Sequence, residues 1–134
     1  MAEDTVLKEY LSPEMIESGA KLITRLDEMG VPIVAAFWFF DSERNDWRLR
    51  LAAPDLYAPG RDLYLKVREA KDALGEEVEA LSMFGVSLTD LNDKTVRTLR
   101  KNVPTDPKVL SRIRLKRNAF DGHFMDDVLV YRAA

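Results

Sequence analysis

The sequence predicts one α+β domain, with a mainly antiparallel sheet and helices packed on one face of it. Two pairs of strand-like segments are each joined by a short polar segment, as in β-hairpins. Segments with helical periodicity separate the two pairs, which is typical of the α+β class. The length of 134 residues, with 46% hydrophobic and 32% charged residues, fits a single domain over 1–134. Residues 1–11 are expected to be a flexible start.

The first helix is predicted from its start signal and its periodicity. Ser12 is a favoured N-cap and Pro13 is favoured at the first helical position. Apolar residues then recur at helical spacing as far as Met29, and Gly30 suits the position after a helix end. We therefore expect a helix over residues 13–29.

The first hairpin is predicted for residues 31–51. Residues 31–40 contain no polar side chain, which is typical of a strand buried on both faces. Residues 47–51 alternate apolar and cationic side chains, as expected for a strand with one wet face. The polar residues 41–46 between them form the turn.

The middle of the chain contains two shorter helices. Residues 63–74 have a helical apolar stripe that ends at Gly75. Residues 76–81 either add a short helical turn or lead into a strand, and residues 84–88 indicate a short strand. Asp93 is a suitable N-cap for a basic helix that continues to about Lys101.

A second hairpin closes the chain. Residues 111–116 alternate apolar and mainly cationic side chains, residues 118–122 supply a turn, and residues 124–131 form the last strand. The predicted order of elements is αββαβαββ.

Charge is unevenly distributed along the chain. Residues 1–93 carry 10 Lys/Arg and 19 Asp/Glu, a net charge of −9, whereas residues 94–118 carry nine Lys/Arg against Asp106 alone, a net charge of +8. Such asymmetry indicates either an anionic partner or two parts of one fold that neutralise each other. The second interpretation is preferred, because folded domains usually mix their charges in space.

Five cations are the candidate binding residues. Side chains alternate across a strand, so the cations of each strand should lie opposite its apolar side. If both apolar sides face one helix layer, all five cations share one solvent-facing surface. They are Arg48, Arg50, Arg112, Arg114 and Lys116. Their counter-charge is either internal, from Asp126 or Asp127 on the last strand, or external, from an acidic protein or from single-stranded nucleic acid.

Trp38 and Phe40 are the candidate interface residues. Both point to one face of the apolar strand, with Phe37 and Phe39 on the other. If helices cover only one face, large aromatic side chains are exposed, and an exposed apolar patch usually marks a partner surface. The alternative is a core strand that is covered on both sides.

Catalytic and metal sites have weak support in the sequence. The chain has no cysteine and a single histidine, His123, whose neighbouring acids suit a hairpin turn as well as a general base. Glu76, Glu77 and Glu79 form an acidic cluster without the spacing of a calcium loop, so we interpret it as solvated surface. No catalytic residue, metal ligand or cofactor is assigned.

Two segments resemble a known family. They are Trp38-Phe39-Phe40 through Trp47-Arg48-Leu49 and Ala53-Pro54, and Arg112-Ile113-Arg114-Leu115 through Asp127-Val128-Leu129-Val130-Tyr131-Arg132. Together they resemble a family of small uncharacterised bacterial proteins. The resemblance implies a bacterial origin and a cytoplasmic location, but no activity and no site residue.

We therefore expect a cytoplasmic, non-catalytic protein-interaction domain that self-associates as a homodimer or binds an acidic protein. A nucleic-acid-binding accessory protein is the first alternative, and a small enzyme with an unrecognised site is the second. The longest apolar run, residues 31–40, is too short to cross a bilayer, so no membrane partner is expected.

Overall fold

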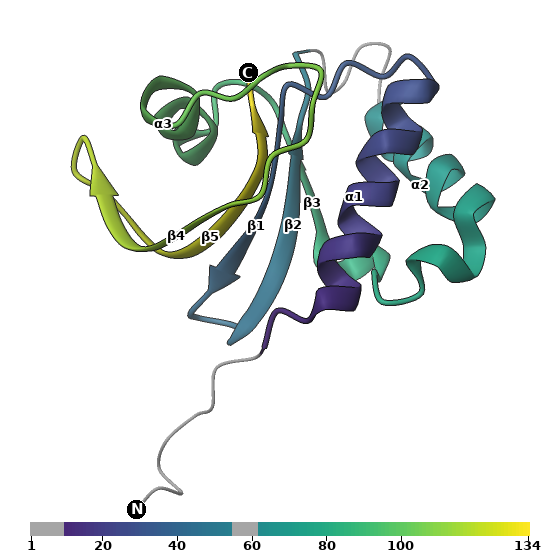
Figure 1. Ribbon diagram of the computed structural model, residues 1–134, viewed down its shortest axis with the longest axis horizontal. Helices are drawn as coiled ribbons and strands as arrows, with labels where there is room; N and C mark the ends of the chain where they lie inside the picture. Colours follow the sequence, from purple (N-terminus) through teal and green to yellow (C-terminus); the bar gives the residue numbers. More distant parts are fainter. Residues whose placement is uncertain (1–9, 55–61) are drawn as a thin grey trace, which may run out of the picture.

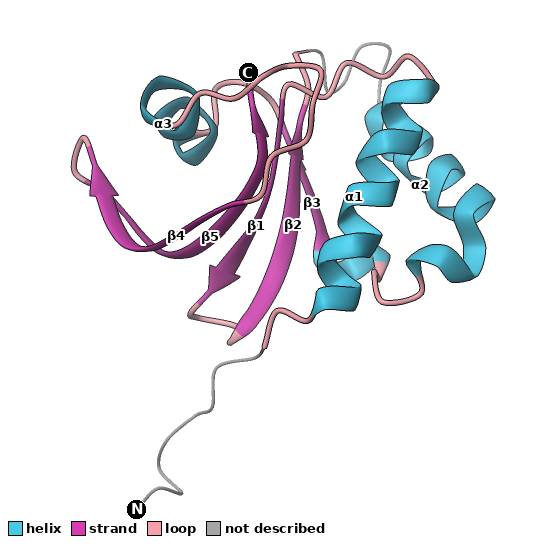
Figure 2. Ribbon diagram, viewed as in Figure 1, coloured by secondary structure: helices cyan, strands magenta, loops and turns pink. Residues whose placement is uncertain are grey.

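A five-stranded sheet with helices on both of its faces forms the centre of the structure (Figures 1 and 2). The computed structural model describes residues 10–54 and 62–134. Its helices are α1 (Pro13–Glu28), α2 (Asp62–Leu74) and α3 (Lys94–Asn102), with short 3₁₀ helices η2 (Gly75–Val78) and η3 (Met83–Gly85). Its strands are β1 (Ala35–Asp41), β2 (Asp46–Ala52), β3 (Val86–Thr89), β4 (Ile113–Phe120) and β5 (His123–Ala133).

The α+β class is confirmed, and the sheet is mainly antiparallel. The strand order is β3-β2-β1-β5-β4, so the two hairpins are joined at the centre by the antiparallel pair β1 and β5. β3 adds to β2 as the single parallel pair. The two 3₁₀ helices between α2 and β3 are additional to the predicted elements, and η2 resolves the uncertainty over residues 76–81 in favour of a helical turn.

The prediction that all helices pack on one face is wrong. α1, α2 and η2 contribute to the apolar cluster on the face that contains Trp38 and Leu49, whereas α3 contributes Val96 and Leu99 to the cluster around Phe37. Figure 2 shows α3 on the opposite side of the sheet from α1 and α2. The reason is β1 itself: its side chains are apolar on both faces, so both faces need a cover.

The first helix has the start that the sequence predicts. The Ser12 side chain accepts a hydrogen bond from the Met15 backbone N–H at 3.1 Å, and Pro13 is the first helical residue. Leu22, Ile23 and Leu26 are fully buried on its sheet-facing side. Burial of this stripe is what holds a helix of this length on the sheet.

A β-bulge interrupts the pairing of β1 with β5. Ala36 pairs with Arg132 and Phe37 with Val130, which leaves Tyr131 as the extra residue. The bulge breaks the alternation of β5, and both Tyr131 and Arg132 reach the α1 side of the sheet: Tyr131 bonds to the Ile16 carbonyl and Arg132 to Asp27. No helix within residues 10–54 and 62–134 is both long and apolar enough to cross a membrane.

Candidate functional site

The five predicted cations do not share one face of the sheet. Arg50 is in register with Phe37, and Arg48 with Phe39, so both arginines lie on the α3 side. Arg114 is in register with Leu129, and Leu129 with Trp38, which places Arg114 on the α1 side. Lys116 follows Arg114 by two residues on β4 and takes the same face.

The prediction of one cationic sheet face is therefore wrong. As with the predicted helix packing, the reason is that helices cover both faces of the sheet. The apolar side chains of β4, Ile113 and Leu115, pack into the cluster that α3 covers. The apolar side of β2, which includes Leu49 and Leu51, packs beneath α1. The two strands thus turn their wet sides in opposite directions.

Three of these cations have internal partners. Arg50 Nη1 lies 3.2 Å from Asp93 Oδ1, and its guanidinium also lies over the Phe39 ring, with 4.4 Å from Cζ to the ring centroid. Arg112, just before β4, bonds to Glu17 of α1 at 2.5 Å.

The third pair contains the most buried carboxylate of the three. Arg114 donates two hydrogen bonds to Asp127, at 2.6 and 2.8 Å, and the Asp127 side chain is only 3% exposed. The hydrogen bond that Arg114 donates to Asp127 raises the pKa of Arg114. The internal counter-charge that the sequence suggested at Asp127 is thus present.

The position of α1 determines how exposed the two predicted interface residues, Trp38 and Phe40, are. Trp38 is 1% exposed, because α1 covers that face of the sheet. It is a core residue, so the prediction that it lies on an exposed interface is wrong. Phe40 is partly exposed near the end of β1, where it packs edge-on against Trp47 with ring centroids 5.6 Å apart.

Sequence reasoning missed a second group of cations, on α3. Lys94, Arg97 and Lys101 are spaced to share one side of the helix, and they line an open groove of about 380 Å³ together with Thr98 and Asp121. Lys94, Arg97 and Lys101 are all exposed. The sequence contains a signal for this cationic side of α3: Asp93 sets the start of the helix, and the i, i+3, i+7 spacing places the three cations on one side of it. We call these residues the α3 groove.

The turn of the β4–β5 hairpin contributes Asp121 to the α3 groove, and Figure 1 shows this hairpin end beside α3. Asp121 accepts a hydrogen bond from Asn102 Nδ2 at 3.1 Å and lies 3.5 Å from Lys101 Nζ. The Asn102 hydrogen bond, and next the charge of Lys101, lower the pKa of Asp121. His123 Nε2 and Thr95 Oγ1 are 2.8 Å apart. The hairpin tip is thus fixed to α3 at both residues.

A small pocket of about 240 Å³ lies on the other side of the Thr95–His123 contact. Besides these two residues, side chains of β1, β2 and β5 line it, among them Phe39, Arg50 and Asp126. Polar groups from separate elements converge there on an aromatic wall, a composition typical of ligand sites. We call it the His123 pocket. Within the described part of the chain, no three His, Cys, Asp or Glu residues are arranged to hold a metal ion.

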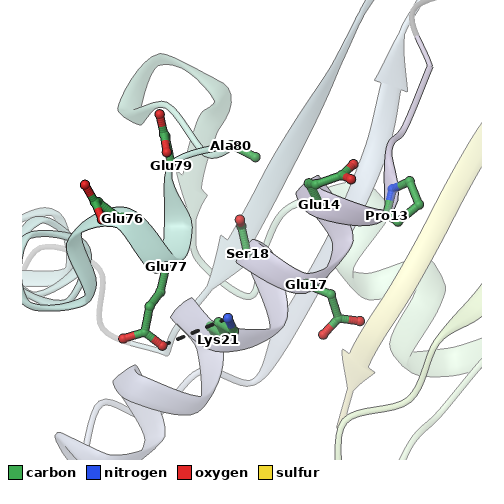
Figure 3. A pocket seen from close by; sticks show the side chains of 9 residues that line it. All are labelled: Pro13, Glu14, Glu17, Ser18, Lys21, Glu76, Glu77, Glu79 and Ala80. Carbon is green, nitrogen blue, oxygen red and sulfur yellow. Dashed lines mark ion pairs between the residues drawn. The ribbon is translucent and has the colours of Figure 1, made fainter.

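The opposite side of the molecule is acidic. α1 and η2 border a hollow of about 510 Å³, shown in Figure 3. Its charged residues are five glutamates and Lys21, which lies 4.0 Å from Glu77. Glu76 and Glu79 of the predicted acidic cluster are both exposed there. This acidic hollow therefore repels anions, and the α3 groove attracts them.

No protein-family model matches the chain, and neither a curated protein nor a solved structure is significantly similar to it. Function is therefore inferred from the geometry and charge of the α3 groove and the His123 pocket.

Proposed function

We propose that the protein binds single-stranded nucleic acid, with the phosphates held in the α3 groove. The observation that carries the proposal is the state of its cations. Within residues 10–54 and 62–134, no carboxylate pairs with Lys94 or Arg97, whereas Arg50, Arg112 and Arg114 are each paired. Like charges at i, i+3 and i+7 repel one another, and an anionic ligand relieves that repulsion.

The difference in charge between the two sides of the molecule determines where such a ligand docks. The acidic hollow is bordered by α1 and η2, and the groove by α3. Figure 1 shows α1 and α3 on opposite sides of the sheet. A polyanion is repelled from the first and attracted to the second, so a chain with an overall net charge of −3 still has one favoured docking side.

A single strand fits better than a duplex because aromatic residues line the His123 pocket, which neighbours the groove. Phe124, next to His123 on β5, is 60% exposed, and Phe39 lines the neighbouring pocket. Proteins that bind single strands combine a cationic groove with aromatic surfaces on which unstacked bases lie. The bases of a duplex are already stacked and do not need such surfaces.

The test is the salt dependence of binding to a fluorescein-labelled oligo-dT, followed by anisotropy. For single strands the slope of log K against log salt is about −0.7 per neutralised phosphate, so three contacts predict a slope of about −2. In Lys94→Glu/Arg97→Glu the affinity should fall more than tenfold. The matched control is Lys66→Glu/Arg68→Glu, which makes the same charge change at exposed positions of α2.

Three outcomes contradict the proposal. One is no binding to the oligonucleotide at low salt. Another is an equal loss in the α2 control, which would mean that net charge alone decides. The third is equal affinity for poly-L-glutamate, which would favour an acidic protein partner instead.

A further inference from the structure

We infer that the His123 pocket holds one unstacked base of the strand whose phosphates occupy the α3 groove. This inference rests on the proposed function and assigns a second, base-binding subsite to it. It is carried by the position of the pocket, its lining and its size.

The pocket and the groove have no lining residue in common, but α3 and the β4–β5 hairpin contribute to both. Thr95 lines the pocket, while Lys94 and Thr98, on the same helix, line the groove. His123 lines the pocket, and Asp121, two residues earlier in the hairpin turn, lines the groove. The 2.8 Å contact between Thr95 and His123 is thus the boundary between them. A nucleotide with its phosphate on Lys94 has its base close to the pocket.

The lining of the pocket suits a base rather than a phosphate. Arg50 offers N–H donors, and the Thr95 hydroxyl can donate or accept. Base edges present mixed donors and acceptors, so such a lining can match them. Asp126 would repel a phosphate at this place, which leaves the cations of the groove as the better phosphate site.

The Arg50 guanidinium adds a stacking surface. Its Cζ atom lies 4.4 Å from the centroid of the Phe39 ring, so the guanidinium covers that face of the ring and is itself the flat group on which a base can stack. Flat π-faces of this kind, aromatic ring and guanidinium alike, are what single-strand binders use to hold bases. The volume of about 240 Å³ is below the roughly 300 Å³ at which pockets for drug-sized ligands begin. A single ring system is therefore a better match than a larger cofactor.

The experiment compares two oligonucleotides of equal charge, oligo-dT and a fully abasic strand of the same length. The wild-type protein should bind oligo-dT about tenfold more tightly, because stacking one base on an aromatic surface is worth about this much. Thr95→Val removes the hydroxyl, and Ser42→Trp adds bulk at an exposed residue that lines the pocket. Both should reduce this ratio towards one without changing the salt slope. Thr24→Trp, at an exposed residue of α1 outside the pocket and the groove, is the control for Ser42→Trp and should behave as wild type.

A second measurement separates the failure of this inference from the failure of the proposed function. Free nucleosides carry no phosphate, so they report on the pocket alone. In ¹H–¹⁵N NMR spectra, millimolar nucleosides should shift the amides of Thr95 and His123 and leave those of α2 unchanged. If oligo-dT and the abasic strand bind equally and no nucleoside shifts these amides, the base subsite is refuted, while phosphate binding in the groove stands. Amide shifts with nucleosides but no oligonucleotide binding would support the pocket and refute the groove.

Discussion

Trp38 Nε1 donates a hydrogen bond of 2.9 Å to Tyr131 Oη, and this contact joins β1 to β5 beneath α1. The Tyr131 hydroxyl in turn donates to the Ile16 carbonyl of α1 at 2.5 Å. Burial raises the pKa of Tyr131 strongly, so the hydroxyl keeps its proton and remains a donor. One phenol thus connects the two central strands to the helix that covers them.

Tyr131→Phe is expected to destabilise the fold. The ring remains, but the buried indole N–H of Trp38 loses its acceptor, and an unsatisfied buried polar group costs about 1–3 kcal/mol. Urea unfolding followed by Trp fluorescence measures the change. Tyr10→Phe is the control, because Tyr10 is 74% exposed and should have no measurable effect. Equal stabilities for the two variants would mean that water replaces the lost hydroxyl.

Gly19→Ala should also destabilise, although alanine normally favours a helix. A Cβ atom on Gly19 would lie 2.5 Å from Tyr131 Oη and 3.0 Å from Trp38 Nε1, so α1 must move away from the sheet. Overpacking of this kind costs about 1–3 kcal/mol, which exceeds the roughly 1 kcal/mol gain in helix propensity. Gly85→Ala is the control, since a Cβ there meets no atom within 4 Å. A more stable Gly19→Ala variant would contradict the close contact.

Local signals in the sequence predicted the elements because each signal acts within a few residues. The N-caps Ser12 and Asp93 both accept the expected backbone hydrogen bonds. Asp121 and Gly122 both have positive φ, at 53° and 78°, as a two-residue hairpin turn requires. The predicted turn at 118–122 was too long, because β4 continues to Phe120.

Placement of side chains on faces was less predictable, because it depends on distant segments. The apolar residues of α1 and β2, such as Leu26 and Leu49, are fully buried, but Ile113 and Leu115 of β4 are only partly buried. β4 lies at an edge of the sheet, where cover is incomplete. The prediction that five cations share one face was wrong because α3 covers the second face of the sheet. No local sequence pattern indicates on which face a helix packs.

The acidity of Asp121 reports whether the hairpin tip is attached to α3. Its folded-state pKa is lowered, first by the Asn102 hydrogen bond and then by Lys101. This contact therefore stabilises the fold above the ordinary Asp pKa of about 4 and is lost as the pH falls through the lower folded value. In an NMR titration, Asn102→Ala should raise the pKa of Asp121 towards its ordinary range.

Glu17 is the internal control for that titration. Its pKa is lowered by the hydrogen bond from Arg112, on the other side of the sheet, and should not respond to Asn102→Ala. An unchanged Asp121 pKa in the variant would show that the tip is not held by Asn102.

Arg132 is a buried cation, and its pairing with Asp27 offsets the free-energy cost of burying the charge. Its side chain is 3% exposed and bonds to both carboxylate oxygens of Asp27, at 3.0 and 2.8 Å, and to the Ile33 carbonyl. Removing one partner of a fully buried pair costs about 3–5 kcal/mol, since the other charge is left uncompensated. Asp27 is 39% exposed, so water offsets part of this, and we expect Asp27→Asn to cost about 1–3 kcal/mol.

A double-mutant cycle with Arg132→Met separates this cause from a general effect on α1. In the Arg132→Met background there is no buried guanidinium for Asp27 to neutralise, so Asp27→Asn should cost almost no free energy of unfolding. The control is Glu28→Gln, at the next position of α1, where the pair with Arg25 spans 3.6 Å and both side chains are well exposed. That change should cost only a few tenths of a kcal/mol. If Asp27→Asn costs the same in both backgrounds, the loss arises from α1 itself and not from an unpaired Arg132.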